Sequence, residues 1–203
     1  MSVFEDIRDA CRQVAEASRW VEIRANRMPA YVKRLPLDRI SDPQMDWDHH
    51  FRGETDAMLA YFLTLAAVNF GSGYFPHLTK GPGLTGYYTI ATRLRDYFTD
   101  HGPFTAEALV NMDANRCSRL FRQPADDPIV DELMGHFGQA FRQLGRQLLE
   151  EFQGSCAQMV TAAENSAARL VTILSRMPYF NDREEYRGRK IPFLKRAQLA
   201  AAD

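Results

Sequence analysis

Apolar residues recur every three or four positions along most of the chain, and this spacing predicts amphipathic helices. The clearest helix runs from Pro128 to Phe152, because Asp127 can cap its start and Gly154 can end it. An opening helix carries Val3, Ile7 and Cys11 on one side. Residues that we expect to be buried lie on single helix faces: Leu63, Phe137, Phe141, Leu144, Leu170 and Leu174.

Capping residues and apolar spacing mark the remaining predicted helices. These begin at Thr55 (through Phe70), near Tyr87 (through Phe98), at Thr105 (Ala106 to Met112), at Asp113 (Ala114 to Phe121), at Ser155 (through Leu174, closed by Met177-Pro178) and near Lys195. Met28-Pro29 interrupts the pattern, and only Lys190 to Leu194 alternates weakly as a strand does. The pattern predicts an all-α, single-domain helical bundle over residues 1–203.

A predicted loop from Leu35 to Asp48 ends in a group of metal-binding residue types, Asp46-Trp47-Asp48-His49-His50-Phe51. Adjacent histidines point in different directions, and no His-x3-His spacing is present that could bring two rings to one ion. We therefore predict no metal, and no other cofactor.

The stretch from Leu59 to Pro76 joins a buried helix to a polar turn. Gly71-Ser72-Gly73 permits positive φ and can expose backbone N–H groups, and Asn69, Phe70, Tyr74 and Phe75 flank the turn. Polar backbone beside aromatic faces suits a nucleoside phosphate. It equally suits a well-packed helix terminus.

Composition and charge limit the possible functions. The chain has 203 residues, 45% of them hydrophobic, and a formal net charge of −1. This charge does not indicate the basic surface that binds a nucleic-acid polymer. Three widely spaced cysteines indicate reduced thiols rather than disulfides or zinc. The N-terminus has no secretory signal, and no apolar run is long enough to span a membrane. We expect a soluble cytoplasmic protein.

The segment from Met177 to Gln198 is dense in polar groups flanked by aromatic residues. Asp182 begins a turn, and Gly188 can form a tight corner. Lys195 lies on a half-apolar segment, so we expect it to be partly buried and paired, with Asp182 as the nearest candidate partner. The alternative is an ion pair that only ties the last helix to the body.

This segment resembles the signature FP-x-F-x-D-x-x-x-Y-x-G-x-x-V-x-F-x-KRAQ of the queuosine salvage proteins, the queuosine 5′-phosphate N-glycosylase/hydrolase family. His50-Phe51 and Asn69-Phe70 resemble that family's HF and NF motifs, and the residues from Ser166 to Leu174 resemble its SA-x-x-LV-x-x-L helix. The resemblance covers essentially the whole chain.

The resemblance implies a helical fold similar to that of DNA glycosylases and cleavage of queuosine 5′-monophosphate to release queuine. It implies catalytic roles for Asp182 and Lys195. It also implies substrate binding by a larger set: His50, Asn69, Phe70, Ser72, Tyr74, Tyr186, Arg196 and Gln198. The partner would be this small nucleotide, with no nucleic-acid polymer and no membrane.

Two departures from the family pattern matter. Ala66 stands where many members have an aspartate. The chain also stops at Asp203, before a FADY/FADN-x-x-P segment whose aspartate is the family's expected catalytic carboxylate, so we expect a fragment or a shortened relative. A non-catalytic nucleotide-binding or interaction domain of the same fold is the alternative function. Glycosylase action on DNA fits less well, because the chain is near neutral and lacks the hairpin motif that grips DNA.

Overall fold

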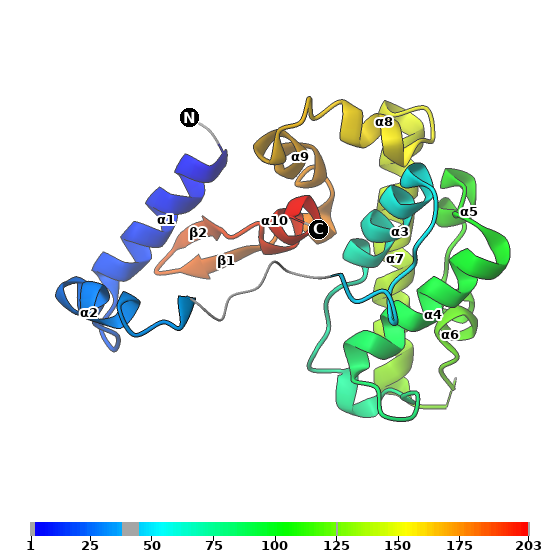
Figure 1. Cartoon of the computed structure of the whole chain (residues 1–203), viewed down its shortest axis with the longest axis horizontal. Helices are drawn as coiled ribbons and strands as arrows, with labels where there is room; N and C mark the ends of the chain where they lie inside the picture. Colours follow the sequence, from blue (N-terminus) through cyan, green and yellow to red (C-terminus); the bar gives the residue numbers. More distant parts are fainter. Residues whose placement is uncertain (1–2, 38–44, 125, 203) are drawn as a thin grey trace.

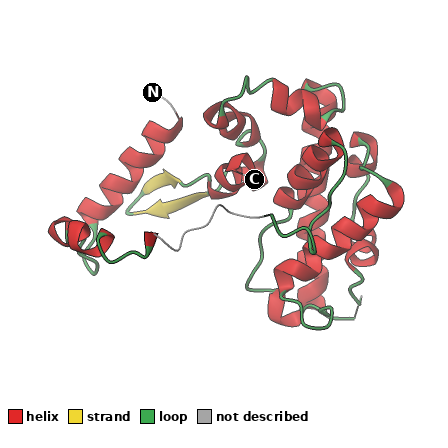
Figure 2. Ribbon diagram, in the orientation of Figure 1, coloured by secondary structure: helices red, strands yellow, loops and turns green. Residues whose placement is uncertain are grey.

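The computed structural model describes residues 3–37, 45–124 and 126–202. A helical bundle forms one end of the molecule, and the first helices form the other, with a small β-hairpin and the last helix between them (Figure 1). Figure 2 shows how strongly helices dominate the described residues. The all-α fold class predicted from the sequence is therefore confirmed.

The helices in chain order are α1 (Val3–Ala17), α2 (Met28–Val32), α3 (Thr55–Ala67), α4 (Gly86–His101), α5 (Ala106–Val110), α6 (Ala114–Phe121), α7 (Pro128–Glu151), α8 (Cys156–Thr161), α9 (Ala167–Leu174) and α10 (Lys195–Ala202). Among the described residues, 3₁₀ turns include Ala25–Arg27, Phe75–His77 and Pro178–Phe180. The hairpin strands are β1 (Arg183–Tyr186) and β2 (Arg189–Pro192).

Helix α7 is the centre of the bundle. Helices α3, α5, α6 and α8 all contact it. Two of its glycines permit close approach, since a Cβ at Gly138 would lie 3.0 Å from the backbone of Asp113 and one at Gly145 would lie 2.6 Å from the carbonyl oxygen of Ala106. All six residues that we predicted to be in the core are buried.

The predicted caps Thr105, Asp113, Asp127 and Ser155 begin four of the helices, α5 to α8. The Asp127 carboxylate accepts N–H groups of Ile129 and Val130, and Asp113 accepts the N–H of Arg116 at 2.7 Å. Thr105 and Ser155 cap α5 and α8 in the same way. Each side chain satisfies a backbone donor that has no partner within its helix.

Three predicted boundaries were wrong. Thr55 is the first residue of α3 rather than its cap, and Glu54 before it makes no capping hydrogen bond. Pro29 does not end a helix but lies in the first turn of α2, where a missing N–H costs nothing. The predicted helix from Ser155 to Leu174 is two helices, because Glu164 and Asn165 adopt positive φ and Ser166 caps a new start at α9.

The hairpin was predicted only in part. Strands β1 and β2 pair antiparallel, with Glu184 opposite Ile191. Arg187 and Gly188, with φ of 52° and 73°, form the two-residue connection, as a type I′ turn requires. Gly188 thus forms the expected tight corner.

The N-terminal arm, as we call residues 19–37, extends from α1 away from the bundle (Figure 1). Every residue of the arm is exposed. Helix α1 itself contacts β2 and α9. Part of the predicted loop from Leu35 to Asp48 lies outside the described residues, at 38–44.

Candidate functional site

The turn after α3 has the geometry of a tightly packed helix terminus. Gly71 adopts φ of +83°, and a Cβ there would lie 2.6 Å from the Leu133 side chain. The Tyr74 N–H donates to the Gly71 carbonyl at 2.8 Å, which closes the turn. Gly73 does not adopt positive φ, so only Gly71 uses the freedom that we predicted for both glycines.

An aromatic and cationic group, which we call the Phe70 cluster, forms where this turn meets the C-terminal segment. It consists of Phe70, Phe137, Tyr179 and Arg196. The rings of Phe70 and Tyr179 stack with centroids 5.2 Å apart, and Phe137 meets Phe70 edge-on at the same distance. The Arg196 guanidinium lies 4.7 Å from the Phe70 centroid, and it donates to the Tyr179 carbonyl oxygen. Two motifs far apart in sequence therefore meet at one place.

A hydrogen-bond network joins Tyr179 of the cluster to polar side chains of α7. The Tyr179 hydroxyl donates to Gln139 Oε1 at 3.1 Å, and His136 Nδ1 lies 2.8 Å from the same hydroxyl oxygen. Because the hydroxyl proton goes to Gln139, the Nδ1 proton of His136 is the donor to Tyr179. His136 Nε2 then faces Glu132, at 3.8 Å.

Sequence reasoning missed Glu132, His136, Gln139 and Gln143, although a signal was present. They recur at intervals of four, three and four on α7, which places them on one helix face beside the buried stripe. Gln143 completes the set by accepting the Tyr179 backbone N–H at 3.0 Å. A polar stripe next to a core stripe on the central helix could have identified this face.

Two tyrosines of this region have perturbed acidity. Burial raises the pKa of Tyr74, and the Glu132 carboxylate raises it further. Burial also raises the pKa of Tyr179, although the positive charge of Arg196 opposes this effect. Both phenols therefore remain protonated near neutral pH and act as hydrogen-bond donors or acceptors.

Asp182 and Lys195 lie beside the Phe70 cluster, but not as the sequence suggested. The Asp182 carboxylate accepts the backbone N–H groups of Lys195 at 2.9 Å and Arg196 at 3.4 Å, so it caps α10. The Lys195 side chain is exposed, and no described residue forms an ion pair with it. The prediction of a buried, paired Lys195 was wrong, because α10 starts at Lys195 and directs Ala197 rather than Lys195 into the core.

His50 belongs to a different aromatic group. It is buried, with Nδ1 2.8 Å from the Asp46 carbonyl oxygen and Nε2 2.8 Å from the Tyr87 hydroxyl. Its neighbour His49 turns to the Asp46 carboxylate, and this hydrogen bond lowers the pKa of Asp46. This group shares no residue with the Phe70 cluster.

The other predicted site residues are spread over several elements. Tyr186 donates its hydroxyl to the Ala17 carbonyl oxygen at 3.2 Å, which ties the hairpin to α1. Gln198 donates to the Phe193 carbonyl oxygen at 2.7 Å. Asn69 and Ser72 flank Phe70 in the turn after α3, with Asn69 half-buried and Ser72 exposed. The structure thus brings Phe70 and Arg196 together, and the Tyr74 ring lies near His136, with centroids 6.4 Å apart. Tyr186 and His50 lie elsewhere.

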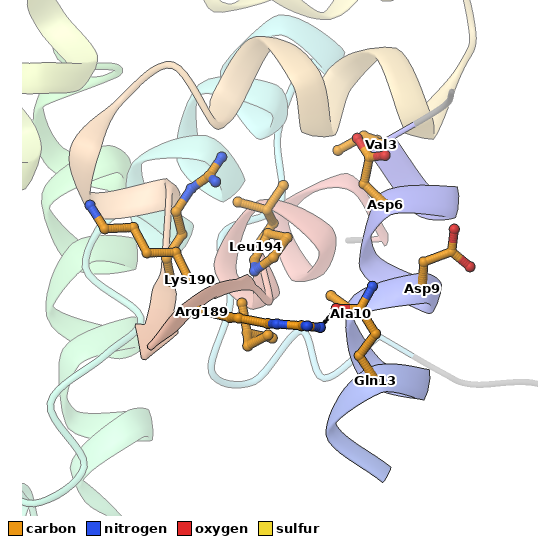
Figure 3. A pocket seen from close by; sticks show the side chains of 11 residues that line it. Val3, Asp6, Asp9, Ala10, Gln13, Arg189, Lys190 and Leu194 are labelled. Carbon is orange, nitrogen blue, oxygen red and sulfur yellow. Dashed lines mark hydrogen bonds between the residues drawn. The ribbon is translucent and has the colours of Figure 1, made fainter. Parts of the chain in front are cut away.

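A charged cavity of about 480 Å³ lies between α1 and the hairpin (Figure 3). Arg189 extends from β2 to Gln13 on α1, where Nη1 donates to Oε1 at 2.9 Å. Asp6 and Asp9 line the α1 side, opposite the basic residues of the hairpin. Acidic residues of α1 and basic residues of the hairpin therefore line the same cavity, although Asp9 turns away from the hairpin in Figure 3 and pairs with Arg12 instead.

Neither a metal cluster nor a membrane span is found in the described part of the chain. No group of three or more His, Cys, Asp or Glu residues converges there. Likewise, no helix within residues 3–37, 45–124 and 126–202 has the length and apolar character to cross a bilayer.

The arrangement can hold a flat, polar ligand. Aromatic rings bind a heterocycle, a guanidinium binds an anion, and hydroxyl, amide and imidazole groups provide hydrogen bonds. Arg196 and Tyr179 already contact the Phe70 ring, so a base would have to displace one of them to stack there. Fold and site together define a helical protein whose polar and aromatic groups suit a nucleotide.

Comparison with known proteins gives the family. The family model described as "Queuosine salvage protein" matches residues 49–203, and the chain belongs to that family. A protein of Sphaerobacter thermophilus named queuosine 5′-phosphate N-glycosylase/hydrolase is 27% identical over 197 residues, which cover 95% of this chain and 60% of that protein. Proteins of the same name from Mus musculus and Dictyostelium discoideum are 27% and 30% identical, over 75% and 49% of this chain. The chain spans three fifths or less of the length of these relatives.

Proposed function

We propose that this chain binds queuosine 5′-monophosphate and takes part in hydrolysis of its N-glycosidic bond, which releases queuine. Family membership and the shared name of its relatives support this reaction. One structural observation supports the assignment of particular residues. The guanidinium of Arg196, in the C-terminal motif, lies 4.7 Å from the ring centroid of Phe70, in the Asn-Phe motif. Residues from two separate family-like motifs thus form one contact.

The chemistry requires a flat base to be held while charge develops on the sugar. Bond cleavage passes through an oxocarbenium-like sugar, which a carboxylate stabilises while water attacks C1′ and the base departs with a proton from a donor. We assign base binding to Phe70 and Tyr179, and anion binding to Arg196. Asn69, Ser72 and Tyr74 would supply polar contacts from the turn.

Two carboxylates are candidates for stabilising the sugar cation. Asp182 is the candidate from the sequence, but its oxygens accept two backbone N–H groups of α10. Glu132 reaches the Phe70 cluster through His136. Asp182→Asn removes the charge and keeps one of the two acceptor oxygens that bind the start of α10, and circular dichroism checks that the variant folds. A loss of turnover in Asp182→Asn but not in Glu132→Gln would assign the role to Asp182, and the reverse result would assign it to Glu132.

Queuine release from queuosine 5′-monophosphate, measured by chromatography, tests the proposal. Removing a charge-assisted contact costs about 2–4 kcal/mol, so Arg196→Ala should lower turnover roughly 30- to 1,000-fold. Arg146→Ala is the matched control, because Arg146 is exposed on α7 and lies outside the Phe70 cluster. Equal turnover in the two folded variants would contradict the assignment of Arg196.

Lys195 remains a candidate for binding the 5′-phosphate as an exposed cation. Lys195→Ala should then raise KM more than it lowers kcat, because a surface contact to the phosphate acts on substrate and transition state alike. Lys195→Arg should restore only part of the affinity, since a forked guanidinium differs from a point charge. An unchanged KM in Lys195→Ala would remove this residue from the site.

A non-catalytic nucleotide-binding domain is the second candidate function. The chain's match to only 60% of the length of the Sphaerobacter relative favours it. Calorimetric binding of queuosine 5′-monophosphate without queuine release would support it. Salt-dependent binding of DNA would instead point to a polymer substrate.

We also propose that residues 1–203 form one domain and that the protein is cytoplasmic. The contacts of α10 with both α3 and α9 support a single domain. Three free cysteines support a reducing compartment. Cooperative unfolding with coincident circular dichroism and fluorescence transitions tests the first point, and fractionation of cells tests the second.

A further inference from the structure

Four hydrogen bonds hold Tyr179 in place. Its backbone N–H donates to Gln143 Oε1 at 3.0 Å, and its backbone carbonyl oxygen accepts from the Arg196 guanidinium. Its hydroxyl donates to Gln139 Oε1 at 3.1 Å, and His136 Nδ1 lies 2.8 Å from the hydroxyl oxygen. Three of these contacts come from the long helix α7, although Tyr179 itself lies in a 3₁₀ turn of three residues. The central helix of the bundle thus fixes both the backbone and the hydroxyl end of this tyrosine.

These contacts orient the Tyr179 ring more than they stabilise the fold. Tyr179 is half-buried and the His136 side chain is 38% exposed, so water can replace their hydrogen bonds and the net gain in stability from each is modest. The direction of the ring, however, depends on them, because a hydroxyl held by both a donor and an acceptor cannot swing away. The ring is held at 26° to the plane of Phe70. Supporting hydrogen bonds that fix one side-chain position are what a preorganised binding surface requires.

The Arg196 guanidinium, which also contacts the Phe70 ring, is held less firmly. Within residues 3–37, 45–124 and 126–202 it donates to the Tyr179 carbonyl oxygen and forms an ion pair with no carboxylate. A base that stacks on Phe70 has to displace either this guanidinium or the Tyr179 ring. The difference in contacts favours displacement of the guanidinium, which is then available to an anionic group of the ligand.

We propose that His136 is a positioning residue for nucleotide binding. It holds the Tyr179 hydroxyl so that this ring stays beside Phe70 as a fixed part of the base-binding surface, and the base displaces the Arg196 guanidinium instead. His136 acts through Tyr179 and does not itself touch the base. This inference rests on the proposed function, because the ligand is queuosine 5′-monophosphate.

The direction of the hydrogen bond gives a signature that needs no substrate. Because the Tyr179 hydroxyl proton goes to Gln139, the ring of His136 has to carry a proton on Nδ1. NMR of the 203-residue chain with ¹⁵N in its five histidines shows which ring nitrogens are protonated at neutral pH, and the His136→Asn variant identifies the signal of His136. An unprotonated Nδ1 in His136 would overturn the proposal.

Calorimetric binding of queuosine 5′-monophosphate to the full 203-residue chain tests the role itself. His136→Ala should weaken binding roughly 3- to 10-fold, which is the effect of losing one hydrogen bond. His136→Asn should restore most of the affinity, because its amide nitrogen, like Nδ1, is two bonds from Cβ and can donate to Tyr179. His101→Ala is the matched control and should bind as the parent does, since His101 also lies beside a tyrosine, Tyr97, but at the end of α4 and outside the Phe70 cluster.

A double-mutant cycle shows whether His136 acts through the Tyr179 hydroxyl. Tyr179→Phe keeps the ring and removes the hydroxyl, so His136→Ala should weaken binding no further in that background. A histidine that only supports the fold would lower the affinity by the same factor in both backgrounds. Circular dichroism checks that each variant folds before its affinity is measured.

The sign of the change shows which group the base displaces. If the base displaced the Tyr179 ring, loosening that ring in His136→Ala would make binding tighter. Tighter or unchanged binding in His136→Ala, no recovery in His136→Asn, or a full effect of His136→Ala in the Tyr179→Phe background would overturn the proposal and leave the proposed function intact. A parent chain that neither binds the nucleotide nor releases queuine would instead contradict the proposed function, and the positioning role with it.

Discussion

Helix α7 and the N-terminal arm both contain many apolar residues, but α7 buries these side chains and the arm exposes them. In α7, Phe137, Phe141 and Leu144 are fully buried against neighbouring helices. In the arm, Trp20 and Ile23 are also apolar, but they are 94% and 65% exposed. Apolar character alone therefore does not decide burial. Regular spacing along a long helix lets neighbours pack against α7, and the short, irregular elements of the arm offer no such face.

Replacement of Phe141 by Ala should have the largest effect on stability. The ring is fully buried and lies near Phe104 and Phe121, so its removal leaves a cavity at the centre of the bundle. We expect a loss of about 3–5 kcal/mol in the free energy of unfolding. Urea denaturation followed by circular dichroism measures it. A loss below about 1 kcal/mol would place Phe141 outside the core.

Gly145→Ala should have the next largest effect, although it adds only a methyl group. The new Cβ would lie 2.6 Å from the Ala106 carbonyl oxygen and 2.8 Å from the Val110 backbone nitrogen, neither of which can move without shifting α5. Overpacking of this kind costs about 1–3 kcal/mol, more than the gain in helix propensity.

Gly135→Ala is the control for Gly145, because a Cβ at Gly135 meets nothing within 4 Å. It should stabilise α7 slightly through helix propensity. Equal melting temperatures for the two variants would show that α5 does not approach α7 as closely as the structure indicates.

Acid should weaken the start of α7 through Asp127. Hydrogen bonds from the Ile129 and Val130 N–H groups lower the pKa of Asp127 below its usual value. A lowered folded-state pKa means that the contribution to stability is present above the unfolded pKa and is lost as pH falls through the folded value. The melting temperature of the parent should therefore fall more steeply below pH about 4 than that of Asp127→Asn, which caps without titrating. Parallel pH profiles would contradict this effect.

Local signals in the sequence predicted the bundle well. Asp127, Asp113, Thr105 and Ser155 cap the helices where capping chemistry places them, because a cap depends only on residues two or three positions away. The hairpin was harder to predict. Strand β1 is Arg-Glu-Glu-Tyr and mostly exposed, so it shows no apolar alternation.

The candidate site depends on long-range contacts, which a single sequence shows less well. The resemblance to a family suggested Phe70 and Arg196, but no local pattern indicates that they touch. Lys195 was expected in the interior because of its apolar neighbours, yet the phase of α10 turns it outward. Glu132 and His136 were not predicted, because the apolar stripe of α7 indicates only which face is buried and says nothing about the polar face beside it.

The smallest effect should come from Trp20→Ala, despite the size of the side chain. Trp20 is 94% exposed, so its removal leaves no cavity, and substitutions at such positions change the free energy of unfolding by less than about 0.5 kcal/mol. Trp47→Ala is the natural comparison, since Trp47 is only 39% exposed and Arg52 lies 5.6 Å from its ring centroid. That cation–π contact alone contributes about 0.5–1 kcal/mol.

Urea denaturation followed by circular dichroism, which does not require a tryptophan, measures both tryptophan variants on the same scale. Trp47→Ala should lose stability, and Trp20→Ala should not. A loss of more than about 1 kcal/mol in Trp20→Ala would mean that the N-terminal arm is covered in the free chain. The contrast between the arm and α7 would then be wrong, because the apolar residues of both regions would contribute to one core.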